Sequence, residues 1–345
     1  MGRLVELKLT MSVSIFLVSF IFAVFLAIIM FLINFPILYA LIGTIIFILI
    51  QYLIGPAIVR SSTHLRYLKP GENPWLESTV KELAEKSQIP MPKVATVPDD
   101  TPNAFVFGRT SSTATLAVHE GLLKRLNKDE VEGVIGHELG HIKHKDYVVM
   151  TMLSALPLLA YLIARGTWIA ARFSGSSSSK KEGSSIRAAF FIIGIISYIV
   201  YIISLLCVMK LSRLREHYAD AYSAYATSSP RSLQSALAKI SYGLSLSQKP
   251  TSGARAFYIG DPALARQEIH SVMARKEEYD LDKDGVLDER ELEFAMEKEA
   301  KSTWSKINTW FSTHPPTFKR ILLLRQIDEE METGRYASDR VYANI

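Results

Sequence analysis

Two histidines and a glutamate in the stretch GHELGH, residues 136–141, have the types and spacing of a hydrolytic metal site. His137 and His141 are four residues apart, so on a helix both imidazoles lie on one face and can bind one metal ion. Glu138 is turned about 100° from His137 around the helix, beside the metal, where it can take a proton from metal-bound water. Zinc suits two imidazoles with an open position, and it would lower the pKa of the water toward about 7. The alternative is a polar helix face that matches the pattern by chance.

A third zinc ligand must come from elsewhere in the chain. His144 does not fit, because three-histidine sites carry the third histidine farther along, after a glycine turn; we expect it to face solvent or lipid headgroups. The segment SRLREHYADAYSAYA, residues 212–226, is helical by composition and has Glu216 and Asp220 four residues apart. Glu216 would bind the metal, and Asp220 would accept the second ring N–H of a ligating histidine and fix its tautomer. The alternative for this pair is an exposed helix face.

The same chain contains long apolar runs. Between Leu9 and Val59 there is no Asp, Glu, Lys, Arg or His. Because one membrane span needs roughly 20 apolar residues, this run is long enough for two helices that turn near Asn34–Pro36. Two further runs, Tyr147–Ala164 and Ala188–Met209, predict a second hairpin, with a flexible Ser-rich linker between them. A buried core hairpin is the alternative for the first pair.

The positions of Lys and Arg predict the orientation of the first hairpin. Its turn carries no charge, whereas basic residues flank both of its ends: Arg3 and Lys8 on one side, and Arg60, Arg66 and Lys69 on the other. The positive-inside rule therefore places both ends, and the polar segment 60–146 with the histidines, in the cytoplasm. The loop of the second hairpin is also basic. Either the first hairpin dominates the topology, or the second does not cross fully.

Composition limits the other possibilities. The 345 residues are 49% hydrophobic and 21% charged, with a formal net charge of +5, and this length permits about two domains. The single cysteine, Cys207, excludes an internal disulfide framework. The modest positive charge suits anionic lipid headgroups. The sequence has neither zinc-finger spacing nor an aromatic-and-basic RNA-binding pattern, so we expect no nucleic-acid partner.

The polar segments should form helices and a small sheet around the histidine helix. Apolar residues at three- and four-residue spacing predict a helix over Pro74–Lys86. Their β-branched content predicts strands at 93–97 and 112–118, and a turn within 101–108 should lead into a short strand. Asn127 and Glu130 form a start like a capping box for a helix that runs through His144.

Four motifs together resemble those of the HtpX-type integral-membrane zinc metalloproteases, relatives of the CAAX prenyl proteases. In family order they are PNAFVFG, GHELGHIKH, SRLREHYADAYSA and STHPPTFKRI, spread over residues 102–321. The resemblance implies that His137, His141 and Glu216 bind one zinc ion, that Glu138 is the general base, and that Asp220 supports the ligands. It also implies a multi-pass, four-span endopeptidase of the cell membrane. Such a protein would cleave peptide bonds of damaged or misfolded membrane proteins on the cytoplasmic side.

The resemblance gives roles to two further motifs. In PNAFVFG it implies that Asn103, Ala104 and Phe105 bind substrate, since an edge strand there could pair with a polypeptide. The residues alone would favour an ordinary Pro-Asn turn. In STHPPTFKR it implies that His314 and Arg320 help to stabilise the oxyanion of the tetrahedral intermediate. Without the resemblance, His314 would more often be a helix-cap or structural histidine.

An acidic stretch, DLDKDGVLDERE, residues 280–291, is not a required part of that family and resembles an EF-hand loop. Carboxylates and one backbone carbonyl fall at its ligand positions, and Gly285 falls at its turn. The ligands would be Asp280, Asp282, Asp284, Val286 through its carbonyl, Asp288 and Glu291. Hard oxygen ligands select Ca²⁺, so calcium is the second candidate ion. Because EF-hands usually work in pairs, an acidic helix–turn–helix without an ion is the alternative.

The sequence therefore predicts a mainly α fold, in which membrane helical hairpins accompany a gluzincin-like α+β zinc protease domain with a small β-sheet. The expected domains are an N-terminal membrane hairpin (1–59), a first catalytic part with the histidine helix (60–146), a second membrane hairpin (147–209), a catalytic part with the glutamate helix (210–265), the EF-hand-like insertion (266–300) and a C-terminal catalytic part (301–345). Expected partners are polypeptide substrates and the lipid bilayer. Two other functions stay open: a CAAX-type prenyl protease, for which four spans are few, and a calcium-binding membrane scaffold without catalysis.

Overall fold

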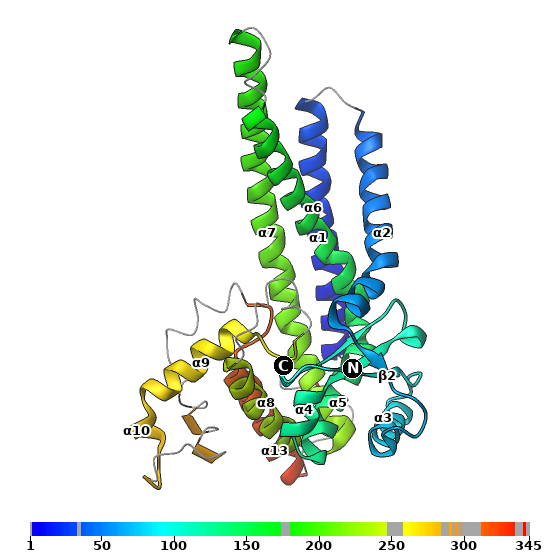
Figure 1. Ribbon diagram of the computed structural model, residues 1–345, viewed down its shortest axis with the longest axis vertical. Helices are drawn as coiled ribbons and strands as arrows, with labels where there is room; N and C mark the ends of the chain where they lie inside the picture. Colours follow the sequence, from blue (N-terminus) through cyan, green and yellow to red (C-terminus); the bar gives the residue numbers. More distant parts are fainter. Residues whose placement is uncertain are drawn as a thin grey trace. The chain divides into compact units, whose positions relative to one another are not determined.

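The chain folds as two compact units. The computed structural model describes residues 2–32, 36–173, 180–246, 258–283 and 312–334, with 290–291, 294–295, 298 and 341–342. The first unit consists of Met1–Leu7, Pro56–Val148 and Ser212–Ile345, and the second of Lys8–Gly55 and Val149–Leu211. Figure 1 shows that the first unit holds the small sheet and the shorter helices, whereas the second holds long helices.

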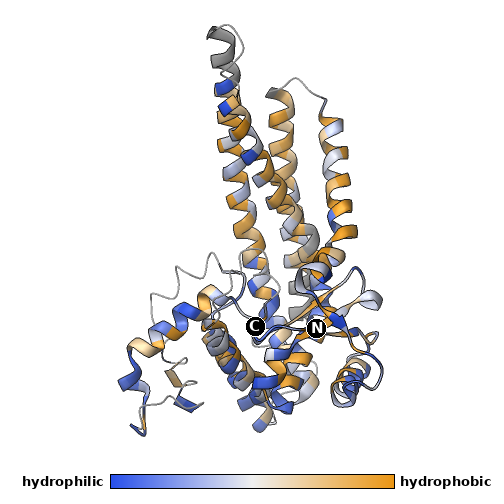
Figure 2. Ribbon diagram, in the orientation of Figure 1, coloured by the Kyte–Doolittle hydropathy of each residue, from blue (hydrophilic) through white to orange (hydrophobic). Residues whose placement is uncertain are grey.

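The long helices of the second unit match the two hairpins predicted from the sequence. They belong to α1 (Gly2–Leu32), α2 (Ile37–Thr63), α6 (Asp146–Phe173) and α7 (Lys180–Thr227). All four are long and apolar enough to cross a membrane, and Figure 2 shows hydrophobic residues along each of them. Helix α7 begins at Lys180, inside the stretch that was expected to be a flexible linker.

Aromatic rings hold α6 and α7 together in the second unit. The ring centroids of Trp168 and Tyr198 are 5.6 Å apart, and those of Tyr161 and Tyr201 are 5.4 Å apart. The indole of Trp168 lies over Gly194, where a Cβ atom would come within 2.3 Å of Nε1. Small residues allow membrane helices to pack this closely. In lipid their association depends on such packing, because the hydrophobic effect does not drive helices together there.

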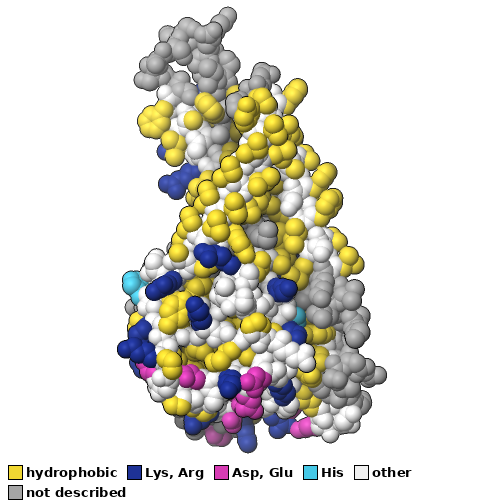
Figure 3. Space-filling view, turned by 90° about the vertical axis from the view of Figure 1, so that its right-hand side faces the viewer, with side chains coloured by type: hydrophobic (Ala, Val, Ile, Leu, Met, Phe, Trp, Pro, Cys, Tyr) yellow, Lys and Arg dark blue, Asp and Glu magenta, His cyan; other side chains and the backbone are white. Residues whose placement is uncertain are grey.

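The surface of the second unit is apolar. Phe16 is 69% exposed, Leu38 61% and Ile45 65%. On the face seen in Figure 3, hydrophobic side chains gather over the long helices. Contiguous apolar surface of this extent is rare on proteins surrounded by water, and it belongs against lipid tails.

A four-stranded mixed sheet forms one layer of the first unit, with strand order β1-β2-β4-β3. β1 (Arg66–Tyr67) pairs antiparallel with β2 (Lys93–Val97), which runs parallel to β4 (Thr115–His119). β3 (Ala104–Phe107) pairs antiparallel with β4 and lies at the edge of the sheet. β2 and β3 were predicted. β4 begins later than predicted because Ser111–Thr113 form a 3₁₀ turn, and the two-residue β1 was not predicted.

Helix α5 (Lys128–His144) carries both histidines and begins as predicted. The side-chain oxygen of Asn127 accepts a hydrogen bond from the Glu130 amide at 2.9 Å, and the Glu130 carboxylate accepts one from the Asn127 amide at 2.8 Å. This capping box satisfies two amides that the helix itself leaves without partners. It therefore fixes where α5 begins, and with it the positions of His137 and His141 along the helix.

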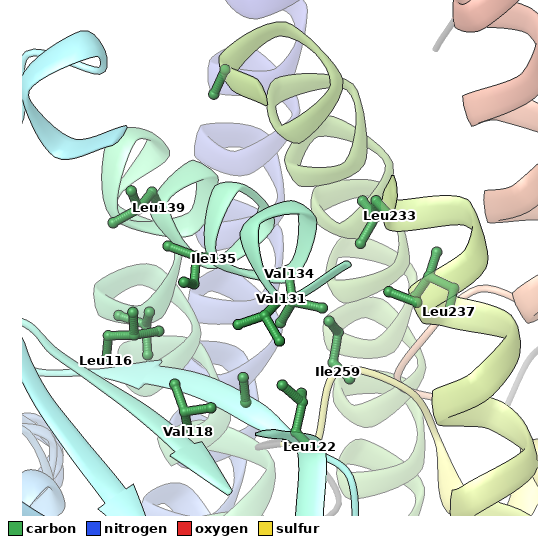
Figure 4. Packing of buried hydrophobic residues seen from close by; sticks show 14 of the residues in the cluster. Leu116, Val118, Leu122, Val131, Val134, Ile135, Leu139, Leu233, Leu237 and Ile259 are labelled. Carbon is green, nitrogen blue, oxygen red and sulfur yellow. The ribbon is translucent and has the colours of Figure 1, made fainter. Parts of the chain in front are cut away.

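One face of α5 packs into the core of the first unit. Figure 4 shows its apolar side chains between the sheet side and α8 (Pro230–Ser245). The labelled residues are Val131, Val134, Ile135 and Leu139 of α5, Leu116 and Val118 of β4, Leu122 of α4 (Glu120–Arg125), Leu233 and Leu237 of α8, and Ile259. Burying each such side chain contributes roughly 1.5–3 kcal/mol. The position of α5, and of its histidines, is thus fixed by packing on two sides.

Four further helices complete the described part of the first unit. Helix α3 spans Pro74–Lys86, as predicted, and Asn73 caps it. Helix α9 covers Pro262–Ala274, α10 covers Lys276–Tyr279, and α13 covers Thr317–Glu332. Neither α8 nor α13 was predicted from the sequence, although α13 carries Arg320 into the core.

Small residues on α5 allow the end of α7 to come close. A Cβ atom on Gly136 would lie 3.0 Å from Ser223 Oγ, and one on Gly140 would lie 3.2 Å from Ala219 Cα. The Ser223 hydroxyl also donates a hydrogen bond to the carbonyl of Gly133 at 2.6 Å. These contacts hold the last turns of α7, which belong to the first unit, directly against the histidine helix.

Replacing Gly140 by valine should therefore destabilise the first unit and lower its affinity for metal ions. The new side chain would push the backbone of α7 at Ala219 away, and such overpacking costs about 1–3 kcal/mol. Thermal unfolding of the purified protein in detergent measures the loss. Gly166→Val is the matched control, because a Cβ there would meet nothing within 4 Å. Equal unfolding temperatures for the two variants would contradict this account of the contact.

Candidate metal centre

Three side chains from α5 and α7 converge inside the first unit. They are His137, His141 and Glu216, whose ligand atoms all lie within 4.8 Å of one another. His137 Nε2 is 3.3 Å from Glu216 Oε2, and His141 Nε2 is 3.5 Å from Glu216 Oε1. The structure thus brings together the three residues that the sequence singled out, although 75 positions of chain separate the second histidine from the glutamate.

The donor set and its surroundings fit a zinc ion. Two imidazole nitrogens and a carboxylate oxygen are the ligands of catalytic zinc sites, which keep a fourth position open. All three side chains are buried. Within the described part of the chain, Glu216 Oε2 is buried and accepts no hydrogen bond. A buried carboxylate oxygen is costly unless a cation or a donor compensates it, and the two Nε2 atoms face the same gap.

Behind His137 lies a buried carboxylate that an arginine holds in place. His137 Nδ1 is 2.9 Å from Asp220 Oδ1. Arg320 donates to both oxygens of Asp220, at 2.8 Å from Nε and 2.7 Å from Nη2. Burial would lower the pKa of His137, but Asp220 and Glu216 raise it to about 9. With Nδ1 engaged by the carboxylate, Nε2 is the nitrogen left for a metal ion.

A second buried aspartate lies behind His141, and the sequence reasoning missed it. Asp146, the first residue of α6, has Oδ2 2.9 Å from His141 Nδ1. Arg215 Nε lies 3.3 Å from that same oxygen. The only signals in the sequence were an acid five residues after His141 and a basic residue immediately before Glu216. Neither is distinctive in a chain with 73 charged Lys, Arg, Asp and Glu side chains (39 basic and 34 acidic).

Glu138, the expected general base, lies beside the ligands on α5. Its side chain is buried, 3% of the residue being exposed. Burial raises the pKa of Glu138, although the neighbouring imidazoles of His141 and His137 act in the opposite direction. A carboxylate with a raised pKa holds a proton more readily than one in water, which suits a group that must accept a proton and release it.

His314 and Arg320, both expected at the oxyanion, take different positions. His314 Nε2 lies 3.8 Å from Glu216 Oε1, and its Nδ1 lies 2.9 Å from the hydroxyl of Thr313. Burial lowers the pKa of His314 to about 4, so the imidazole is neutral near pH 7. The guanidinium of Arg320 is instead engaged by Asp220 and by the carbonyl of Ile259. Its closest contacts are therefore with the support of His137.

The three residues expected to bind substrate lie at the start of the edge strand. Ala104 and Phe105 belong to β3, and Asn103 precedes it. The Asn103 side chain is buried: Oδ1 accepts a hydrogen bond from the Ile259 amide at 2.9 Å, and Nδ2 lies 3.4 Å from His119 Nε2. In this structure the amide of Asn103 therefore makes internal contacts that hold the beginning of β3.

His144 is half-buried and packs against tyrosines, whereas we expected it to face solvent or lipid headgroups. Its Nε2 is 2.8 Å from the hydroxyl of Tyr342, and its ring makes edge contacts with Tyr218 and Tyr222. Burial lowers the pKa of His144 to about 4. The helix turn after His141 thus points this imidazole into an aromatic cluster, which the residue types alone did not reveal.

Part of the EF-hand-like loop is described. Asp280, Asp282 and Glu291 have carboxylate oxygens within 4.8 Å of one another. Glu291 is 4% exposed and accepts hydrogen bonds from the amides of Leu281 and Asp282. The other expected ligands, Asp284, Val286 and Asp288, lie outside the described residues.

Comparisons with known proteins agree with this geometry. The sequence profile described as Peptidase family M48 matches residues 70–328, a range that contains all three candidate ligands. A "Protease HtpX homolog" of Aeropyrum pernix is 33% identical over 280 residues, 81% of this chain and 83% of that protein. Another, of Methanothermobacter thermautotrophicus, is 38% identical over 220 residues, 63% of this chain and 79% of that protein.

Among solved structures, S. mikatae Ste24p covers 94% of this chain and 67% of its own, with a TM-score of 0.47 and 15% sequence identity. The family profile and the relatives confirm the resemblance to HtpX-type proteases that the four motifs indicated. The chain belongs to peptidase family M48.

Proposed function

We propose that the protein is a membrane-embedded, zinc-dependent endopeptidase. The observation that carries this proposal is the convergence of His137, His141 and Glu216, with Glu138 next to the first histidine. When bound there, zinc would lower the pKa of a water molecule and polarise the carbonyl of the scissile peptide bond. The M48 family is a family of peptidases, and the named relatives are proteases, so the reaction class agrees with the donor set.

Glu138 is proposed to act as general base and then as general acid. It takes the proton from the attacking water and returns it to the nitrogen of the departing peptide segment, so the glutamate ends the cycle as it began. The burial of Glu138 supports this role, because a carboxylate away from bulk water exchanges its proton with the reacting atoms rather than with solvent.

His314 is proposed to stabilise the negative charge that develops on the carbonyl oxygen. Its Nε2 lies 3.8 Å from Glu216 Oε1, beside the candidate ligands, where it could face the reacting carbonyl. The hydroxyl of Ser312 fixes the loop by donating to the His314 carbonyl at 2.7 Å. A preorganised N–H of this kind is worth more in a buried site than in water. Arg320 acts through Asp220, by our proposal, rather than on the oxyanion itself.

The substrate is proposed to be an extended polypeptide that adds a strand to the sheet. β3 is an edge strand, and α5 packs near it in the first unit, so a strand beside Ala104 and Phe105 would run past the histidine helix. Backbone pairing of this kind binds many sequences, which suits a protease that removes damaged or misfolded proteins. Asn103 would contribute by holding the start of β3 in place.

We further propose that the metal centre works on the cytoplasmic side of the cell membrane and on membrane proteins. The support is the basic flanks of the first hairpin, which the positive-inside rule places in the cytoplasm. Helix α6 follows α5 after a single intervening residue, Lys145, so the chain passes directly from the metal centre into an apolar helix. Segments of membrane proteins that emerge from the bilayer would therefore meet the site first.

Replacing Glu138 by glutamine should abolish peptide-bond cleavage while zinc stays bound. Glutamine keeps the size of the side chain but cannot accept the proton of the attacking water. Purified wild type and variant are compared for zinc content and for cleavage of casein and of an unfolded membrane protein. Glu132→Gln, on the same helix, is the matched control and should retain activity.

Full cleavage by the Glu138→Gln variant would refute the mechanism. A prenylated peptide, included in the same assay, separates the two enzyme classes. Preferential cleavage of that peptide would favour a CAAX-type prenyl protease over a broad endopeptidase. A wild-type protein that binds zinc and cleaves none of these substrates would instead favour a scaffold.

His314→Ala should lower kcat by about 100- to 1000-fold, the usual cost of removing one oxyanion donor. The zinc content should not change, because His314 is not among the three ligands. Steady-state cleavage of a fluorogenic peptide gives kcat and KM separately. A rise in KM at constant kcat would show that His314 binds substrate and does not stabilise the transition state.

A separate calcium site is proposed at the EF-hand-like loop. Its support is the convergence of Asp280, Asp282 and Glu291, which stand at the first, third and twelfth positions of the loop pattern. The last of these positions normally supplies both carboxylate oxygens to Ca²⁺. This segment lies along the chain between the helix of Glu216 and the loop of His314, so Ca²⁺ binding there is a candidate regulator of cleavage.

Calorimetric titration of the purified full chain should detect Ca²⁺ binding that Glu291→Gln removes, because the glutamine loses the charge and one ligand oxygen. Glu278→Gln is the matched control: it changes an exposed glutamate of α10 outside the ligand positions. Absence of binding to the wild type at millimolar calcium would exclude the site. Cleavage measured with and without calcium, and in an Asp280→Ala variant, tests regulation separately.

A further inference from the structure

His141 has a carboxylate–arginine support of its own, separate from the one behind His137. Asp146 Oδ2 lies 2.9 Å from His141 Nδ1, and Arg215 Nε lies 3.3 Å from the same carboxylate oxygen. Arg215 Nη2 is also 3.5 Å from the ring nitrogen. Asp146 is fully buried, and Arg215 is 7% exposed. Both residues belong to the first unit.

A break in the backbone brings the aspartate to the histidine. Residues five apart on a continuous helix point about 140° away from each other, so Asp146 would then face away from His141. Lys145, however, has φ 59° and ψ 29°, the left-handed conformation, and its amide donates to the carbonyls of His141 and Ile142. This turn ends α5 and starts α6 in a new direction. The first side chain of α6 therefore returns over the last turns of α5.

The two histidines have matching surroundings. In each case Nε2 faces Glu216, and Nδ1 lies 2.9 Å from an aspartate. An arginine also lies against each aspartate: Arg320 donates two hydrogen bonds to Asp220, and Arg215 forms an ion pair with Asp146 at 3.3 Å. The arginines come from different elements, α13 and α7.

The charge of Asp146 has few compensating groups. Its other oxygen, Oδ1, has no hydrogen-bond partner within the described residues. The carboxylate therefore depends on the imidazole of His141 and on the guanidinium of Arg215. A buried carboxylate without such partners is strongly destabilising. Burying such a carboxylate would destabilise the fold if it served packing alone. The shortest contact described for it is with His141, a candidate metal ligand.

We propose that Asp146 and Arg215 are positioning residues for the metal centre: Asp146 accepts the Nδ1–H of His141 and so presents Nε2 to the ion, and Arg215 holds Asp146 in that position. This inference rests on the proposed metal site. Neither residue touches the metal ion or the substrate. Both act through His141, by fixing its tautomer and the orientation of its ring and by raising its basicity as a ligand.

The test measures the affinity of the purified full chain for Zn²⁺ by competition with a fluorescent chelator. Asp146→Asn should raise the zinc dissociation constant about 10- to 100-fold, the usual effect of removing the carboxylate partner of a ligating histidine. The matched control is Asp328→Asn, which removes another arginine-paired aspartate, the partner of Arg231. Its zinc affinity should equal that of the wild type. The absorption spectrum of the Co²⁺-substituted protein should change in Asp146→Asn, because the imidazole is held differently.

Arg215→Gln supplies a second measurement that does not alter the carboxylate. It should also weaken zinc binding, and in the Asp146→Asn background it should have little further effect, because it acts through the residue already changed. Independent, additive effects on zinc affinity would overturn the proposed sequence of contacts. Wild-type affinity and an unchanged Co²⁺ spectrum in both single variants would overturn the positioning role.

His141→Ala separates this inference from the metal site on which it rests. If that variant binds zinc as tightly as the wild type, the site itself is misassigned and both proposals fail. If it loses zinc while Asp146→Asn and Arg215→Gln bind normally, only the positioning role fails. If Asp146→Asn does not fold, the affinity and spectrum of Arg215→Gln decide the question.

Discussion

The contact between α5 and the last turns of α7 is the constraint on which the candidate metal centre depends. The histidines and the glutamate lie on separate helices, so the site exists only while the two backbones stay close. Gly136 and Gly140 leave room for α7, and the hydroxyl of Ser223 bonds to the backbone of α5. The apolar face of α5 is held by the sheet and α8, so it cannot move away to relieve the crowding.

The second constraint on the candidate metal centre is the burial of several carboxylates close together. Four carboxylates lie buried at the site, those of Glu138, Asp146, Glu216 and Asp220, and two arginines, Arg215 and Arg320, lie against the aspartates. With all four carboxylates ionised and with neutral imidazoles, as metal binding requires, the site would carry two net negative charges, four minus two. A divalent cation bound in the gap between the Nε2 and Oε atoms would supply the opposite charge.

Local sequence patterns predicted the elements whose signals lie close together in the chain. The capping box of α5, the limits of α3 and the shared helix face of Glu216 and Asp220 depend on spacings of three or four residues, which helix geometry converts directly into position. The strand β2 was predicted from its β-branched residues. Asp146 was missed because its spacing predicts the wrong face of a helix, and only the left-handed conformation of Lys145 reverses that. Glycine is the usual residue in this conformation, so a lysine there does not indicate the turn from the sequence. The packing of α8 and α13 depends on long-range contacts, which no local pattern encodes.

Calcium binding stays a prediction, because half of its expected ligands lie outside the described residues.

Asp146 is the first residue of α6, and the apolar run of that helix begins at the next residue, Tyr147. The carboxylate next to His141 and the apolar run of α6 are therefore adjacent along the chain. A shift of one residue at the start of α6 corresponds to a rotation of about 100° around the helix, which would turn the carboxylate away from the imidazole. A one-residue insertion between Lys145 and Asp146 would therefore separate the aspartate from His141 while every candidate ligand stays on its own helix.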